Sequence, residues 1–476
     1  MTEAEEGTTK VSMPYRAVQV CSTCKLRKKR CDKTLPICGY CGKRNLLCRY
    51  EDFPQPKGES DAVAAMLMQM VSLLGPSGSM STSHRIWYQV QRIIQFASLS
   101  LQEIGRCYFN NFHKWLPLIS YQVYEEEVTA YNWMSCPPAA DFSILTLAMC
   151  LITLQPNRET PITPQGLYGT VKVLFAETQA MMCAPDRLLQ ASLLIAAYEY
   201  ANGRPEAAHI TMGTSSRIAF GIGLHNTDFE QPFSVGDRVR IEERRRCNLW
   251  WGGIILERLI ICEIKDKEQT PITEYPPPEF PLPTDLDCDG MDSPDADQIA
   301  QISSFGRQAQ AVFLLDQVLA ARRLPLTDKC KMLELRRLDR HLQDFLSMLM
   351  STTTAKIGHD CGPIAPAVRA LSLIHQEILD YSPDTVDMRC LHYSQSALEM
   401  ITNVVVDVAR HHKEQIACEN ARVDLLPLSC SYTLHLAMKN TRDCLGISCP
   451  HRHPSDLESL DQLDRVFSNR WKAKEQ

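Results

Sequence analysis

Residues 21–48 read CSTCKLRKKRCDKTLPICGYCGKRNLLC, and this stretch decides how the amino-terminal end of the chain folds. It contains six cysteines: Cys21, Cys24, Cys31, Cys38, Cys41 and Cys48. Their spacing is C-x2-C-x6-C, written twice with six residues between the two copies. The basic run KLRKKR, residues 25–30, lies between the second and the third cysteine. Thiols at metal-ligand spacing beside dense positive charge indicate a zinc-held module that binds nucleic acid.

The number of thiols predicts how much metal the module holds. Two tetrahedral zinc ions need eight ligand positions, and six cysteines supply them if two thiolates bridge the metals. Soft thiolates favour zinc over harder divalent ions, so two Zn²⁺ are the expected cofactors. A module of about 35 residues is too small to fold on apolar burial alone. Zinc binding is therefore expected to supply its folding energy.

Charge is divided sharply along the chain. Residues 16–50 hold ten Lys or Arg and one acidic residue, Asp32, for a net charge of +9. Because the whole chain carries −6, the remainder carries −15. A small basic module on a larger acidic body predicts contact with double-stranded DNA through one end only.

Cysteine usage and hydropathy predict the compartment. The fourteen cysteines outside the cluster are scattered through apolar surroundings, which is typical of reduced, buried thiols. No secretory signal is visible in residues 1–9, and no apolar run reaches the roughly 20 residues that span a bilayer. The expected protein is intracellular and has no membrane partner. The basic run also fits a nuclear import signal, so the nucleus is the expected location.

The chain is predicted to divide into a small amino-terminal module and a large helical body. Composition places a disordered polar tip at 1–15, the cysteine module at 16–52 and a Pro- and Gly-rich linker at 53–83. Two further parts, 84–290 and 291–476, are expected to form one body. The predicted fold class is a small zinc-organised two-helix cluster domain plus a large all-α regulatory domain.

Hydrophobic periodicity supports the helical prediction. Two segments carry apolar stripes at steps of three and four, Leu335–Leu349 and Leu398–Val408, whereas Leu188–Tyr200 is apolar nearly all round. Neither stripe continues for three or four heptads, so bundle core is favoured over a coiled-coil seam. A Pro- and Asp-rich break at 270–297 is expected to be an irregular surface loop.

The six cysteines, the basic run and Pro36 together resemble the fungal zinc binuclear-cluster, or Zn(2)-C6, transcription factors. The resemblance implies that the first and fourth cysteines, Cys21 and Cys38, bridge the two metals. One zinc would be held by Cys21, Cys24, Cys31 and Cys38. The other would be held by Cys38, Cys41, Cys48 and Cys21.

The same resemblance implies how DNA is read. In the family the first short helix enters the major groove and reads CGG-type triplets. The base-reading lysine of the family falls on Lys28, with Arg27 beside it, and Lys25, Lys29 and Arg30 match phosphate and base-edge cations. Lys and Arg donors suit the O6 and N7 acceptors of guanine, and the other cations position the module on phosphates.

Residues 98–290 resemble the middle homology region, or fungal-specific transcription factor domain, of the same family. The matching segments are Tyr108-Phe109, Trp115–Ile119, Arg217–Ala219, Gly223–His225, Glu242–Arg246, Trp250-Trp251 and Leu256–Arg258. Glu257 stands where the family usually has Asp. For Arg244–Arg246 two interpretations stay open: an ion-paired helix face beside core tryptophans, or an effector site.

The predicted function is a sequence-specific regulator of RNA polymerase II genes, with the transcription machinery or co-regulators as partners and a metabolic or secondary-metabolite gene cluster as target. No nucleophile elbow and no complete dinucleotide fingerprint occurs, so no enzyme is predicted. The alternative is a ligand-sensing or repressor protein whose helical body carries the main activity, with the zinc module as DNA tether. Apolar residues between Val63 and Leu74 give about two heptads, which leaves a homodimer open.

Overall fold

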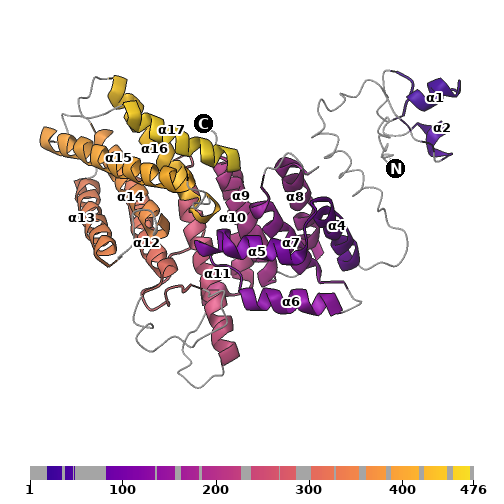
Figure 1. The fold of residues 1–476 in the computed structure, drawn as a ribbon, viewed down its shortest axis with the longest axis horizontal. Helices are drawn as coiled ribbons and strands as arrows, with labels where there is room; N and C mark the ends of the chain where they lie inside the picture. Colours follow the sequence, from indigo (N-terminus) through magenta and orange to yellow (C-terminus); the bar gives the residue numbers. More distant parts are fainter. Residues whose placement is uncertain are drawn as a thin grey trace, which may run out of the picture. The chain divides into compact units, whose positions relative to one another are not determined.

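The computed structural model describes residues 19–34, 38–44, 46, 48, 82–133, 137–155, 162–181, 185–226, 237–266, 269–285, 302–325, 329–352, 361–381, 387–417, 423–446 and 454–471. The chain forms two compact units, Met1–Met66 and Leu67–Gln476, each of which is described by itself. Every helix or turn of helix assigned in the described residues is α or 3-10, and no strand occurs among them (Figure 1). The predicted fold class, a small cysteine-cluster domain and a large all-α body, is confirmed.

Several predicted features lie outside the described residues. They include the tip at 1–15, the linker up to residue 81 with its Val63–Leu74 repeat, and the part of the 270–297 loop after residue 285. The boundaries at residues 52, 83 and 290 stay predictions.

The first unit contains two short helices that start in the same way. Helix α1 spans Ser22–Leu26 and follows Cys21, whereas α2 spans Gly39–Gly42 and follows Cys38. Among the described residues of this unit, the buried hydrophobic cluster consists of thiols, namely Cys21, Cys24, Cys38 and Cys41, with Tyr40 and Leu46 packed against them. Such a core holds almost no apolar surface, so this unit cannot fold on hydrophobic burial alone.

The amino-terminal part of the second unit is built around two helices that are buried on nearly every side. Its helices are α4 (Thr82–Phe96), α5 (Leu101–Asn110), α6 (Tyr121–Trp133), α7 (Ala140–Thr153), α8 (Pro164–Met181), α9 (Asp186–Ala201), α10 (Pro205–Gly221) and α11 (Asp237–Ile261). Helix α7 is buried from Ala140 to Ile152, and α9 from Leu188 to Ala201. Helix α7 packs on α4, α5, α8 and α9, and α9 packs on α10. The predicted all-round apolar helix at Leu188–Tyr200 is therefore confirmed.

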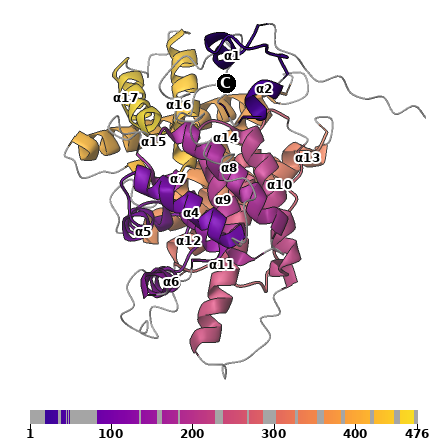
Figure 2. The same cartoon turned by 90° about the vertical axis from the view of Figure 1, so that its right-hand side faces the viewer.

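The carboxy-terminal part adds α12 (Ser304–Arg322), α13 (Lys329–Thr352), α14 (Cys361–Leu379), α15 (Met388–Ala417), α16 (Ser429–Gly446) and α17 (Pro454–Arg470) (Figure 2). Helix α14 packs on α12, α13, α15 and α16. The first predicted stripe lies on α13, where Leu335, Leu338, Leu342 and Leu349 are buried, and the second lies on α15. Both stripes contribute to bundle packing.

The loop after α11 is irregular, as predicted, but part of it is buried rather than exposed. Thr273 is only 3% exposed, and its backbone carbonyl accepts from Arg258 at 2.6 Å. The indole N–H of Trp251 donates to the carbonyl of Pro281 at 2.8 Å. Polar groups of α11 thus replace water around the backbone of this loop, which composition alone could not reveal.

Arg470, the last residue of α17, ties the carboxy-terminal end of the body to α7. Its guanidinium donates to the carbonyls of Ile152 at 2.7 Å and Leu154 at 3.1 Å, at the end of α7. It also donates to Asp424 at 2.5 Å. Arginine at this position satisfies carbonyls that lack partners within their own helix.

Candidate zinc and DNA-binding site

Cysteine itself caps both short helices of the first unit. The sulfur of Cys21 accepts from the N–H of Cys24 at 3.4 Å, and the sulfur of Cys38 accepts from the N–H of Cys41 at the same distance. The backbone N–H of Cys38 in turn donates to the sulfur of Cys48 at 3.3 Å. The sequence repeat is therefore also a repeat of local structure. N–H groups directed at sulfur stabilise the thiolate form that metals bind.

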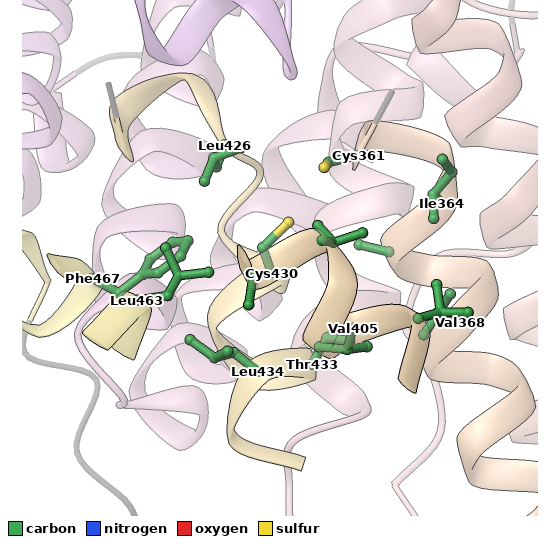
Figure 3. Close-up of a pocket in the computed structure, with 14 residues that line it drawn as sticks. Cys361, Ile364, Val368, Val405, Leu426, Cys430, Thr433, Leu434, Leu463 and Phe467 are labelled. Atoms are coloured by element: carbon green, nitrogen blue, oxygen red, sulfur yellow. The ribbon is translucent and has the colours of Figure 1, made fainter. Parts of the chain in front are cut away.

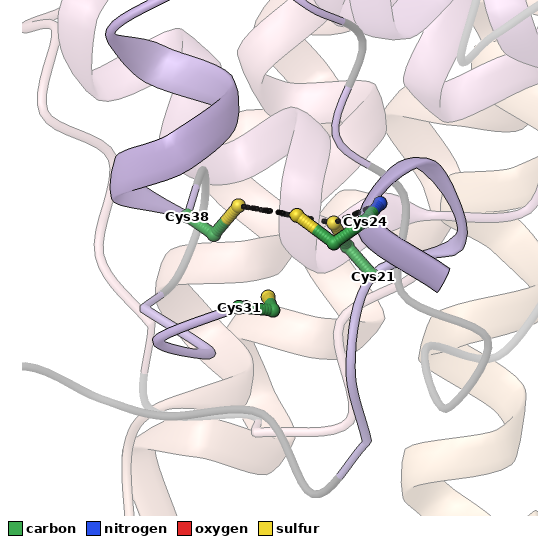
Figure 4. A group of neighbouring side chains, drawn as sticks. All are labelled: Cys21, Cys24, Cys31 and Cys38. Atoms are coloured by element: carbon green, nitrogen blue, oxygen red, sulfur yellow. Dashed lines mark hydrogen bonds between the residues drawn. The ribbon is translucent and has the colours of Figure 1, made fainter. Parts of the chain in front are cut away.

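The six thiols gather into two groups of four. One group contains Cys21, Cys24, Cys31 and Cys38, and the other contains Cys21, Cys38, Cys41 and Cys48. Within each group all sulfur atoms lie within 4.8 Å of one another. Figure 4 shows the first group, in which sulfurs from the starts of α1 and α2 approach each other.

The sulfur spacing suits tetrahedral zinc. The sulfur of Cys38 lies 3.8 Å from that of Cys21 and 3.6 Å from that of Cys24. Tetrahedral Zn–S bonds of about 2.3 Å place neighbouring sulfurs about 3.8 Å apart. A donor set made only of thiols is also the softest that a protein offers, and it selects zinc over magnesium or calcium.

The metal-free thiols mostly hold their protons. Burial raises the pKa of the Cys24 thiol, and contacts with the other thiols raise it further. Burial is also the largest cause of the raised pKa values of Cys21, Cys41 and Cys48. For Cys38 burial is outweighed by hydrogen bonds from Cys41 and other thiols, and the pKa falls to about 6. Zinc must therefore displace protons from most of this cluster.

One carboxylate links the two copies of the repeat. Both oxygens of Asp32 accept from the N–H of Gly39 at 3.0 Å, and Asp32 also accepts from Thr34 at 3.3 Å. These N–H donors lower the pKa of Asp32. A Cβ on Gly39 would lie 2.5 Å from an Asp32 oxygen, so a larger residue at this position would displace the Asp32 carboxylate. Sequence reasoning missed this link, although an acidic residue after Cys31 and a glycine after Cys38 were its visible signals.

The predicted DNA-contacting residues form the end of α1 and the turn after it. All six residues from Lys25 to Arg30 are exposed. The N–H of Lys29 donates to the carbonyl of Cys24 at 3.0 Å, and that of Lys28 donates to Lys25 at 3.2 Å. This is a Schellman ending, in which Lys28 takes the left-handed position with φ 48°. Lys28 therefore occupies a backbone conformation that usually selects glycine.

The second copy of the repeat does not carry the same charge. Seventeen residues beyond Lys28, Lys29 and Arg30, the chain has asparagine and two leucines, at 45–47. The N–H of Leu46 donates to Cys41 at 3.0 Å, just as that of Lys29 donates to Cys24. The backbone turn is thus repeated, but the dense positive charge belongs to the first copy alone.

A thiol cluster with an exposed basic turn, attached to a large all-helical body, defines a zinc-dependent DNA-binding regulator. Residues 19–57 match the fungal Zn(2)-Cys(6) binuclear cluster domain. The chain is 33% identical over 150 residues to "Transcription factor BOA15" of Botryotinia fuckeliana (strain B05.10), over 31% of this chain and 80% of that protein. The chain belongs to the family of fungal Zn(2)-Cys(6) transcription factors. It is a zinc-binding, DNA-binding transcription regulator and not an enzyme.

The arginines before Trp250 form an ion-paired helix face. Arg245 contacts Asp186 at 2.9 Å and Glu242 at 2.6 Å, and Arg246 donates to the carbonyl of Ile222 at 2.9 Å. Trp250 and Trp251 are 4% and 3% exposed. Of the two interpretations offered by the sequence, the structure shows the ion-paired one.

Within the described residues, no helix combines the length and the apolarity needed to cross a bilayer.

Proposed function

We propose that the first unit holds two Zn²⁺ and reads CGG-type half-sites in the major groove. The observation that carries the proposal is the exposed basic turn at Lys25–Arg30, which the thiol cluster fixes at its base. Lys28 is the proposed base reader with Arg27 beside it, and Lys25, Lys29 and Arg30 contact phosphates and base edges. Six thiolates and two Zn²⁺ leave a cluster charge of −2, which the adjacent cations offset.

The proposed metal count follows from the shared thiols. Each of the two groups of four contains Cys21 and Cys38, so these two would bridge and the other four would be terminal ligands. Native mass spectrometry of the full chain should find two zinc ions per molecule. Cys48→Ala should lose one ion first, whereas Cys38→Ala should lose both. A single ion in the native protein would contradict the proposed count.

DNA recognition is tested by fluorescence anisotropy on a CGG-containing duplex and on a scrambled duplex of equal length. Lys28→Ala should reduce the preference for CGG about 5- to 100-fold, which is the usual cost of one lost base contact. Lys43→Ala, an exposed lysine after α2, is the matched control and should change both affinities alike. Affinity should fall steeply with salt because phosphate contacts release counterions. Equal binding to both duplexes would refute sequence-specific reading.

The wider role is proposed from the family. We infer nuclear action on RNA polymerase II genes, through the transcription machinery or co-regulators, with a metabolic or secondary-metabolite gene cluster as target. The domains proposed are a cluster domain at 16–52, a linker at 53–83, a middle homology domain at 84–290 and a carboxy-terminal helical part at 291–476. Homodimer formation is compatible with the short repeat between Val63 and Leu74. Genome-wide mapping of bound sites tests the target genes, and a fluorescent fusion tests the location.

The alternative function, ligand sensing or repression by the helical body, is favoured by one observation. The carboxy-terminal helices line an apolar cavity that no side chain of the described residues fills. If the helical body represses transcription without a ligand, a mutation that fills this cavity should leave reporter output unchanged.

A further inference from the structure

An apolar cavity lies where α14, α15, α16 and α17 meet in the second unit (Figure 3). Its volume is about 80 Å³. Side chains that face it include Val368 from α14, Val405 from α15, Leu434 from α16 and Phe467 from α17. Among the described residues that line it there is no Asp, Glu, Lys, Arg or His. The cavity therefore offers contact area but no charge.

The lining also offers almost no hydrogen bonds. Among the described lining residues the one hydroxyl belongs to Thr433, and it already donates to the carbonyl of Ser429 at 3.1 Å. A water needs roughly 10–15 Å³ of such space and two to four polar partners, so waters would fit here by size but not by chemistry. An apolar wall of this kind gives water few partners and favours hydrocarbon ligands instead.

Two thiols complete one side of the wall. Cys361 begins α14 and Cys430 lies in the first turn of α16, and their side chains are in contact. Contact with Cys361 and burial raise the pKa of Cys430, so its thiol reacts slowly and forms a soft, polarisable part of the wall. The sulfur atoms also suit flat aromatic edges, which pack favourably against sulfur.

We propose that this cavity is a binding site for a small, uncharged, mainly hydrocarbon molecule, such as a single aromatic ring or a short alkyl chain. A charged or strongly polar molecule is excluded because it would lose its hydration without gaining a partner. This site lies in the helical body and does not depend on zinc or on the proposed DNA reading.

A ligand bound in the cavity would stabilise the packing of the helices around it. The walls come from four successive helices, α14 to α17, and α17 also contacts α7 through Arg470. A ligand that binds only this packed arrangement stabilises it by mass action. The expected consequence is a firmer attachment of α16 and α17 to α14 and α15.

Thermal unfolding of the full chain, followed by tryptophan fluorescence, tests the proposal with toluene as the probe and benzoate as its charged counterpart. Toluene should raise the midpoint saturably by about 1–3 °C, and benzoate should not. Val405→Phe, which fills the cavity, should abolish the rise. Val173→Phe places the same side chain on an exposed position of α8 and should keep it.

A second measurement keeps the test decisive if Val405→Phe fails to fold. Toluene should slow alkylation of Cys430 by N-ethylmaleimide in the wild-type chain, as measured by peptide mass spectrometry, and should leave exposed Cys107 unaffected. The proposal is overturned by the absence of any toluene-dependent rise, or by an equal rise with benzoate. Equal protection of Cys107 and Cys430 would overturn it as well. Zinc-dependent DNA binding is measured separately, so failure of one proposal is distinguishable from failure of the other.

Discussion

Arg258 provides the sharpest test of how the helical body is held together, because it is a buried cation with a complete set of partners. It is 1% exposed and donates to Asp316 at 2.8 Å, to Glu257 at 2.7 Å and to the carbonyl of Thr273 at 2.6 Å. Its guanidinium also contacts the Thr273 hydroxyl. These bonds join α11, α12 and the loop after α11. Arg258→Met keeps most of the apolar stem of the side chain but removes every one of these bonds.

The expected loss of folding stability depends on which buried groups the substitution leaves without a partner. Glu257 is fully buried and would lose its cationic partner Arg258, though the N–H groups of Ile272 and Thr273 still donate to it, at 2.8 and 3.2 Å. Breaking one side of a buried pair costs about 3–5 kcal/mol, and the remaining donors place this case near 3 kcal/mol. The double variant Glu257→Gln with Arg258→Met leaves no buried carboxylate. It should therefore cost less than the single variant, about 1–2 kcal/mol.

Equilibrium denaturation in urea, followed by tryptophan fluorescence, measures both values in the full chain. All six tryptophans lie beyond residue 66, so the signal reports the body and not the zinc module. Trp251 is bonded to the same loop through Pro281 and should report its release directly. The reasoning is refuted if Arg258→Met lies within about 1 kcal/mol of wild type, or if the double variant is less stable than the single one.

Three further predictions concern the zinc module. Gly39→Ala should weaken zinc retention against a chelator, because its Cβ would collide with Asp32; retention equal to wild type would contradict this contact. Lys28→Gly should lose as much preference for CGG as Lys28→Ala but should fold at least as well, since glycine takes the left-handed φ at no cost. A less stable glycine variant in circular dichroism would disprove that backbone role. Because burial raises the pKa of the Cys24 and Cys41 thiols, zinc binding should release protons and zinc affinity should rise between about pH 6 and 8. Calorimetry in buffers of different ionisation enthalpy counts the protons, and an affinity independent of pH would exclude the mechanism.

Much of the fold could be predicted because its signals are local. The helical period predicted α9, α13 and α15, and the cysteine spacing predicted which thiols come together. The metal-binding role of these thiols and the DNA-binding role of the basic run stay predictions. The buried part of the loop after α11 could not be predicted from its composition. The prolines and aspartates of this loop predict that it is not helical. Its partial burial depends on contacts with the distant residues Arg258 and Trp251.

The Asp32–Gly39 link shows the same limit at the candidate site. Each residue alone has an ordinary explanation, aspartate as a solvated charge and glycine as a turn former. Their pairing needs the two copies of the repeat to face each other, which spacing within one copy does not encode.

The repeat separates what metal binding requires from what DNA reading requires. Both copies keep a cysteine cap, an N–H bond to sulfur and a turn that returns to the carbonyl of the second cysteine. These features position the thiols, and the cluster needs one set of them from each copy of the repeat. The exposed cations after the second cysteine are dense in the first copy only, which agrees with the proposal that a single helix end enters the groove. Under the proposed function, a duplicated scaffold with one charged face would hold metal symmetrically and meet DNA from one side. This asymmetry explains why mutation of Lys28 should affect recognition and leave zinc in place, whereas mutation of Cys38 should abolish both.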